Sequence, residues 1–132
     1  MRAINPKQIG EQTEAVLMAK LLLRGETVLR PFGDNQRYDM VLDKGGIFVR
    51  IQCKTGRLKK GCITFATYSK AGGGPRKGYD GEVEFFGVYC PENGKSYLIP
   101  IEDCAKNGSS LRIEKITSYN GKKIRWAAQY EI

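Results

Sequence analysis

The sequence predicts an α/β or α+β fold in which one N-terminal helix packs on a mixed β-sheet. Three observations support this class. Residues 6–23 place apolar side chains close to a 3.6-residue period, residues 37–54 read as two strands joined by a glycine turn, and residues 82–100 read as a second hairpin. A helix with one apolar stripe is expected to bury that stripe on one face of the sheet.

The elements follow one another along the chain. The first helix is expected to end at Gly25, because glycine commonly terminates helices. Strands are expected at residues 26–31, 37–43, 47–54, 61–67, 82–90, 96–100 and 111–116, turns at 32–36, 91–95 and 119–122, a long Gly- and Lys-rich loop at 68–81 and a helical turn at 101–105. The pattern of residues 125–132 does not decide their structure.

The composition indicates one cytoplasmic domain. A chain of 132 residues can bury a single core without disulfide support, so we expect one domain over residues 1–132. Its four cysteines form no CxxC pair and it has no histidine, so the spacings of a structural zinc site are missing and reduced cysteines are expected. No signal peptide and no apolar run of the roughly 18 residues that span a bilayer is visible, which indicates a soluble protein without a membrane partner.

Basic residues outnumber acidic ones, and they cluster. Twenty-two Lys and Arg against fourteen Asp and Glu give a formal charge of +8, which suggests a polyanionic partner, with nucleic acid as the first candidate. The alternative is a basic protein whose charge only keeps it dispersed. Clustering beside the hairpin of residues 37–54 favours nucleic acid. The predicted DNA-binding residues are Arg57, Lys59, Lys60, Lys70, Arg76 and Lys77.

The hairpin of residues 37–54 carries the most informative polar side chains. Side chains alternate along a strand, so Gln52 and Lys54 share one face of its second strand. An antiparallel first strand, joined through residues 44–46, can bring Asp39 beside Gln52. An acid, a carbonyl oxygen and an ammonium group would then converge among residues that otherwise belong in a core.

These groups suit hydrolysis of a phosphodiester bond, which needs a divalent cation to neutralise the phosphate. Asp39 offers a hard oxygen ligand for Mg²⁺, Gln52 its side-chain carbonyl oxygen and Cys53 its main-chain carbonyl oxygen. The helix would supply the other acid, either Glu11 or Glu14, which lie three residues apart and so nearly on one face.

Lys54 would complete the set by orienting the attacking water and stabilising charge that develops on the phosphate. Each residue alone also has an ordinary structural explanation. A strand aspartate can serve a turn hydrogen bond, a lysine can mark an exposed strand end, and helix acids can favour the first turns through the helix dipole. The combination of helix acid, strand acid and Gln-x-Lys in this order is what favours a metal-dependent nuclease.

This order of residues resembles the PD-(D/E)xK nuclease superfamily, whose core is a helix carrying an acid followed by a hairpin bearing the D and (D/E)xK elements. Asp39 stands at the first element and residues 52–54 stand at the second. Segments 10–16, 23–25, 28–34 and 38–41 most resemble the homing endonucleases encoded within group I introns, with relatives among Holliday junction resolvases. The likeness covers the first half of the chain well and residues 82–100 more loosely.

The resemblance implies a restriction-endonuclease-like core and a DNA endonuclease that uses Mg²⁺, with Mn²⁺ as a substitute. In that family the helix acid lies a fixed distance before the glycine that ends the helix, which points to Glu14 ahead of Glu11. The resemblance makes Glu14, Asp39 and Gln52 the metal-side residues and Lys54 the catalytic lysine. Gln52 departs from the usual Asp or Glu, although intron-encoded relatives also carry Gln, and a neutral amide binds a hard cation less strongly.

The expected partner is DNA, with no small-molecule substrate. Cutting both strands with one small single-site domain needs at least two copies, so a homodimer or homotetramer is expected. Two alternatives stay open. A Holliday junction resolvase would share the catalytic residues but prefer four-way junctions to linear DNA. A non-catalytic DNA-binding module of the same fold would bind without cutting, and Gln52 is the one hint of it.

Overall fold

Helix α1 (Pro6–Leu23) begins and ends at strong local signals. In the computed structural model the Asn5 side chain accepts a hydrogen bond from the Gln8 main-chain N–H at 2.9 Å, and the Gln8 side chain accepts one from the Asn5 N–H at 3.1 Å. The chain leaves the helix through Gly25, whose φ of 85° suits glycine. The predicted helix bounds are confirmed. The structure describes residues 3–70, 72–115 and 124–132.

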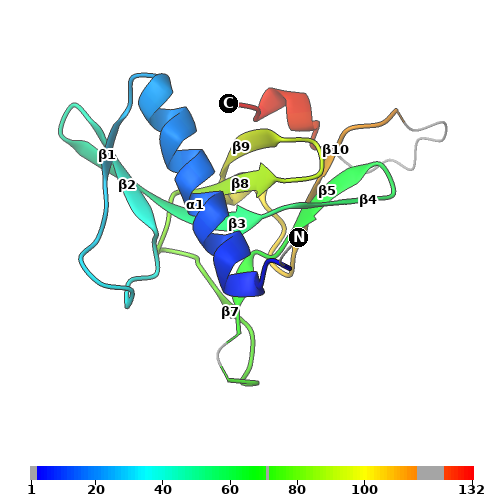
Figure 1. Ribbon diagram of the computed structural model, residues 1–132, viewed down its shortest axis with the longest axis horizontal. Helices are drawn as coiled ribbons and strands as arrows, with labels where there is room; N and C mark the ends of the chain where they lie inside the picture. The colour runs from blue at the N-terminus through cyan, green and yellow to red at the C-terminus, as the bar shows by residue number, and fades with distance from the viewer. Residues whose placement is uncertain (1–2, 71, 116–123) are drawn as a thin grey trace.

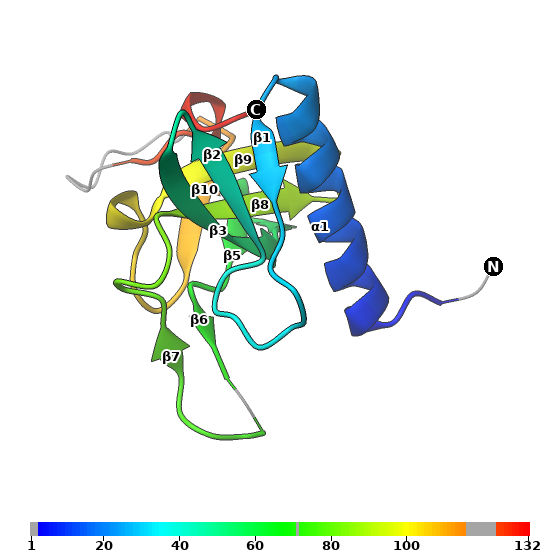
Figure 2. The ribbon, with the colours of Figure 1, turned by 90° about the vertical axis from the view of Figure 1, so that its left-hand side faces the viewer.

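A five-stranded sheet packs against α1, as Figures 1 and 2 show. In spatial order its strands are β1 (Thr27–Leu29), β2 (Met40–Lys44), β3 (Ile47–Thr55), β8 (Phe85–Cys90) and β9 (Lys95–Pro100). The β3–β8 pair is parallel and the other three pairs are antiparallel. The prediction of an N-terminal helix on a mixed sheet is therefore confirmed.

The helix and the sheet share a buried cluster. Leu17 and Leu21 of α1 pack with Met40, Leu42 and Ile51 of the central strands, and each of these side chains is at most 1% exposed. Burying such a side chain stabilises the fold by about 1.5–3 kcal/mol relative to leaving it in water. This packing holds α1 against β3, which carries Gln52 and Lys54, and near Asp39, which directly precedes β2.

The hairpin of β2 and β3 has the predicted register. Met40 pairs with Ile51, and the Asp39 main-chain N–H donates to the Ile51 carbonyl at 2.8 Å, so Asp39 lies beside Gln52. Two glycines at positions 45 and 46, with φ of 68° and 95°, form the tight turn. Two consecutive residues with positive φ match the twist of the flanking strands.

A second, three-stranded sheet consists of β4 (Arg57–Lys59), β5 (Cys62–Phe65) and β10 (Ser109–Arg112), in the order β10-β5-β4. Gly56 alone separates β3 from β4. A Cβ atom there would lie 2.6 Å from Ile63 Cγ2 and 2.9 Å from Val88 Cγ1, so only glycine fits where the chain passes between the sheets. The second buried cluster, which includes Ile63, Phe86, Val88 and Leu111, joins the two sheets.

Strand β4 was not predicted, because all three of its residues are exposed and no alternation marks it. The strand predicted at residues 61–67 is shorter than expected, and the one at 111–116 is displaced, since Ser109 already pairs with Phe65. The main-chain N–H groups of Ile113 and Glu114 both donate to the Gly61 carbonyl, which ends the ladder.

The prediction of a long loop at residues 68–81 is wrong in part, because this segment contains a two-stranded ribbon. Its strands are β6 (Tyr68–Ser69) and β7 (Lys77–Gly78), and Figure 2 shows the ribbon extending away from the main sheet. Long-range contacts define it: the Arg37 guanidinium donates to the Ser69 hydroxyl at 2.6 Å and to the Gly78 carbonyl at 2.7 Å. Sequence periodicity does not report contacts of this kind.

The remaining elements are short. The strand predicted at residues 82–90 begins only at Phe85, because the Glu82 N–H donates to the Tyr79 carbonyl and closes a turn over residues 79–82. A 3₁₀ helix, η1 (Ile101–Asp103), confirms the predicted helical turn, and η2 (Ala127–Gln129) lies in the C-terminal segment that the pattern left undecided. The turn predicted at residues 119–122 lies outside the described residues. All four cysteines are free, as expected. None of the helices in the described ranges is long and apolar enough to cross a membrane.

Candidate active site

The β2–β3 hairpin fixes the position of the Asp39 carboxylate. Asp39 directly precedes β2, because the strand predicted from residue 37 begins only at Met40, and its Oδ2 accepts a hydrogen bond from the Cys53 main-chain N–H at 2.8 Å. The N–H and C=O of a strand residue point to the same edge, so the Cys53 carbonyl also lies on the Asp39 side of β3. The main-chain groups of Gln52 point the opposite way, toward Phe86 of β8. The Gln52 side chain lies on the same face of β3 as the Lys54 side chain.

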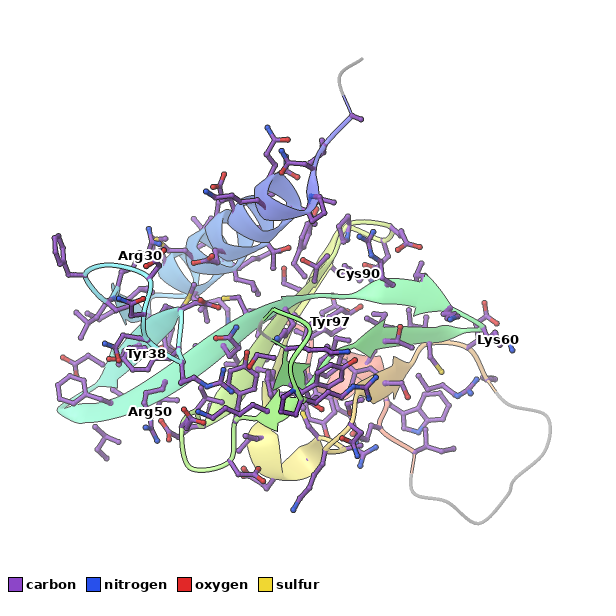
Figure 3. The ribbon with its side chains drawn as sticks, turned by 90° about the horizontal axis from the view of Figure 1, so that it is seen from below. Arg30, Tyr38, Arg50, Lys60, Cys90 and Tyr97 are labelled. Atoms are coloured by element: carbon purple, nitrogen blue, oxygen red, sulfur yellow. The ribbon has the colours of Figure 1, made fainter. Side chains whose placement is uncertain are left out.

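Glu14 of α1 shares a cavity with Asp39. This cavity has a volume of about 140 Å³, and its lining includes Glu14, Asp39 and Arg30. The Arg30 guanidinium lies 3.6 Å from the Glu14 carboxylate and follows β1 in the chain. Figure 3 shows Arg30 and Tyr38, which also lines the cavity, on the same side of the molecule. Helix and hairpin thus bring the two predicted acids to one opening.

Burial and like charge both act on these acids. Burial raises the pKa of Asp39, while the hydrogen bond from Cys53 and the charges of Lys54 and Arg30 lower it. Burial likewise raises the pKa of Glu14, the charge of Asp39 raises it further, and Arg30 opposes both effects. Burial disfavours the charged form of both carboxylates, and a cation bound between them would favour it.

The alternative helix acid, Glu11, occupies a different place. It lines a neighbouring cavity of about 160 Å³ together with Glu14 and Arg30, and Asp39 does not line that cavity. The charge of Glu11 also raises the pKa of Glu14. Because Glu14 shares one cavity with Glu11 and another with Asp39, the geometry favours Glu14 as the partner of Asp39.

The donor set fits a hard divalent cation. Within the described residues, no group of three or more His, Cys, Asp or Glu side chains gathers around one point. Glu14 and Asp39 line one cavity, and the hairpin sets Gln52 and Cys53 beside Asp39, so the predicted donors are two carboxylates, one side-chain amide and one main-chain carbonyl. All four can present oxygen, and Mg²⁺ takes oxygen ligands and commonly keeps several waters.

Lys54 is held in place by two tyrosines. Its Nζ donates to the Tyr68 carbonyl at 3.0 Å and lies 3.2 Å from the Tyr79 hydroxyl. The same Nζ lies 5.0 Å from the centre of the Tyr79 ring, and the Arg37 guanidinium lies 4.0 Å from it. A buried aromatic ring that attracts two cations restricts where the lysine can go.

The sequence as a whole matches known nucleases. A model of the PD-(D/E)XK endonuclease family, described as "PD-(D/E)XK endonuclease", covers residues 4–132. The chain belongs to this family. A solved structure titled "The structure of a bacterial homing endonuclease: I-Ssp6803I" superimposes with a TM-score of 0.68 at 21% identity, over 98% of this chain and 88% of that one. The fold is therefore restriction-endonuclease-like, as expected. No curated protein sequence matches the chain.

Membership in the PD-(D/E)XK family makes DNA the implied partner, and the predicted DNA-binding cations form two groups on this endonuclease fold. Arg57 and Lys59 lie on the exposed strand β4, and Lys60 follows at the turn to β5 with a φ of 50°. Figure 3 shows Lys60 at the opposite end of the molecule from Arg30.

The second group lies on the ribbon. Lys70 is exposed after β6, the Arg76 guanidinium lies 4.3 Å from the centre of the Tyr68 ring, and Lys77 Nζ lies 3.9 Å from the Glu82 carboxylate. Tyr68 therefore contacts the site lysine through its carbonyl and a ribbon cation through its ring.

Three residues at the site were not singled out from the sequence: Arg30, Arg37 and Tyr79. Arg30 lies within a segment that resembles the family, but no periodicity assigns it a partner on α1. Arg37 and Tyr79 are 42 positions apart in the chain and meet because Tyr79 directly follows β7, whose Gly78 carbonyl accepts from Arg37. A search for aromatic residues within the Gly- and Lys-rich segment would have found Tyr68 and Tyr79 and would not have distinguished their roles.

Proposed function

We propose that this protein is a metal-dependent DNA endonuclease that hydrolyses phosphodiester bonds, with site-specific double-strand cleavage of the homing type as its activity. The observation that carries the proposal is the cavity that Glu14 of α1 and Asp39 of the β2–β3 hairpin line together. Lys54 lies two residues beyond Gln52 on β3. The homing type is supported by the fold likeness to a bacterial homing endonuclease.

Glu14, Asp39, the Gln52 side-chain oxygen and the Cys53 carbonyl would hold Mg²⁺, or Mn²⁺ in its place. When bound, the cation neutralises the phosphate and lowers the cost of deprotonating the attacking water. Asp39 keeps one carboxylate oxygen on the Cys53 N–H, which fixes its orientation. Gln52 leaves the site with two carboxylates instead of three, so we expect it to need a higher metal concentration.

Lys54 would act on the substrate directly. Its ammonium group is a compact positive charge with three donors, of which Tyr68 and Tyr79 engage two directions. The remaining direction can orient the water or stabilise charge on a phosphate oxygen. Because each chain carries one such site, cleavage of both strands would require a homodimer or homotetramer.

The decisive experiment compares wild type, Asp39→Asn and Lys54→Ala on supercoiled plasmids and on four-way junctions, with Mg²⁺, with Mn²⁺ or with EDTA. We expect metal-dependent cleavage by the wild type and its loss in Asp39→Asn, which can still accept the Cys53 hydrogen bond. Lys54→Ala should lower the cleavage rate by roughly 10²–10⁴-fold and leave DNA binding largely intact. Asp80→Asn is the control, because the Asp80 side chain is 73% exposed.

Each other outcome has a clear meaning. Cleavage that persists in EDTA would contradict the metal dependence, and cleavage by Asp39→Asn would show that Asp39 is not part of the active site. Preferential cutting of junctions would favour a Holliday junction resolvase, and binding without cleavage under any metal would indicate a non-catalytic DNA-binding module. Loss of binding together with cleavage in Lys54→Ala would make Lys54 a phosphate anchor.

A further inference from the structure

A second and larger hollow lies beyond the end of β3. It is an open cleft of about 510 Å³, and residues of β3, β4, β5 and β10 line it together with the start of the ribbon. It shares no lining residue with the cavity of Glu14 and Asp39. The cleft is therefore a separate feature of the surface.

The chemistry of the cleft suits a polyanion. Two of its lining residues, Arg57 and Arg125, are basic, none is acidic, and the exposed Ser110 adds a hydroxyl group. Neither arginine forms an ion pair with any acid in the described part of the chain. Guanidinium groups pair bidentately with phosphate, and hydroxyl and main-chain N–H groups are common phosphate donors.

The cleft adjoins the candidate catalytic lysine. Thr55, on its wall, directly follows Lys54 in β3. Tyr68, also on the wall, holds the Lys54 ammonium through its carbonyl at 3.0 Å, and its ring carries Arg76 at 4.3 Å. A polyanion in this cleft would thus lie next to Lys54 and within reach of the ribbon.

We propose that this cleft binds the phosphodiester backbone of the DNA strand next to the phosphate that is cut, with Arg57 and Arg125 as its anchors. The proposal rests on the proposed endonuclease function, because it takes Lys54 as the position of the scissile phosphate. An extended DNA strand suits the site, since the cleft is open and its lining extends over β3, β4, β5 and β10.

The test measures DNA affinity as a function of salt concentration. Fluorescence anisotropy with a labelled duplex, in EDTA to prevent cleavage, gives the slope of log affinity against log salt. Each phosphate contact contributes about 0.9 to that slope. We expect Arg57→Gln and Arg125→Gln each to lower its magnitude by about 0.9 and the double variant by about 1.8. Arg24→Gln, an exposed arginine that follows α1 and does not line the cleft, is the matched control and should leave the slope unchanged.

A second variant guards against a folding defect at Arg125. Ser110 is exposed within the cleft, so Ser110→Glu adds a negative charge there without removing a buried group. It should weaken duplex binding at least tenfold at low salt, whereas Ala19→Glu, at an exposed position of α1, should not. Unchanged slopes in the double variant together with unchanged affinity of Ser110→Glu would overturn the proposal.

The two proposals fail in different ways. A wild-type protein that cuts DNA while the cleft variants bind and cut as it does would remove the cleft from the interface and leave the endonuclease intact. A wild-type protein that neither binds nor cuts DNA would overturn both.

Discussion

The Tyr79 hydroxyl lies 3.2 Å from the Lys54 ammonium nitrogen, and the ring that carries it is 4% exposed. The same ring packs edge-on against Phe86, with centroids 5.6 Å apart, and lies beneath the Arg37 guanidinium. Tyr79 thus belongs to the core and to the candidate site at once. This contact links the position of Lys54 to the ribbon, because Arg37 also binds Ser69 and Gly78.

Tyr79→Phe should keep the buried ring and remove only the hydrogen-bonding group. A hydrogen bond to a charged group contributes roughly 1.5–3 kcal/mol, so we expect single-turnover cleavage to slow by about 10–100-fold at unchanged DNA affinity. Rapid-quench kinetics and anisotropy measure the two quantities. An equal loss of binding would show that Tyr79 orders the DNA-binding ribbon instead of positioning Lys54.

Asp39→Asn should change how stability depends on pH. Burial raises the pKa of Asp39 in the folded state, so the folded protein holds this proton more tightly than the unfolded chain. The stability contributed by this group is fully present below the ordinary Asp value of about 3.9 and is lost as pH rises through the raised value.

The variant cannot titrate, so it should gain on the wild type as pH rises and lose that advantage in acid. Urea unfolding in EDTA between about pH 3 and pH 8 measures the difference. Asp80→Asn, at an exposed position, should show no such trend. A stability difference between the two proteins that does not change with pH would contradict the effect of burial.

Gln52→Glu should tighten metal binding. A third carboxylate adds negative charge to the site, so we expect the Mg²⁺ concentration that half-saturates thermal stabilisation to fall on the order of tenfold. Without metal the variant should be less stable than the wild type, because three acids then repel one another. Melting curves over a Mg²⁺ series measure both effects without DNA. Gln129→Glu, exposed on η2, is the control, and equal midpoints in the two variants would remove Gln52 from the metal site.

Gly56→Ala should destabilise the fold. Its Cβ would meet Ile63 and Val88 at less than 3.0 Å, and overpacking of this kind costs about 1–3 kcal/mol. Gly10→Ala is the control with the opposite expected sign. Nothing lies within 4 Å of a Cβ at this helical position, and alanine stabilises a helix by about 0.8–1.0 kcal/mol relative to glycine. Thermal melts of both variants should therefore shift in opposite directions. A Gly56→Ala protein as stable as the wild type would mean that the crossing between the sheets can relax.

The predictions that the structure confirms concern local features. The bounds of α1 follow from Asn5, Gln8 and Gly25, which act within one turn of the helix ends. The register that sets Asp39 beside Gln52 follows from the hairpin turn and the alternation of β3. The roles assigned to Glu14, Asp39, Gln52 and Lys54 stay predictions, although the cavity shared by Glu14 and Asp39 supports them.

The sequence by itself determined the helix, the hairpin and the pairing of an acid with Gln-x-Lys, because neighbouring residues dictate helix caps, tight turns and strand alternation. Only the tertiary structure decided that Glu14 and not Glu11 shares a cavity with Asp39, that Arg37 and Lys54 meet at the Tyr79 ring, and that Arg57 and Arg125 line one cleft. These residues are far apart in the chain. Their meeting depends on how α1, the ribbon and the second sheet pack, and no local periodicity encodes that packing.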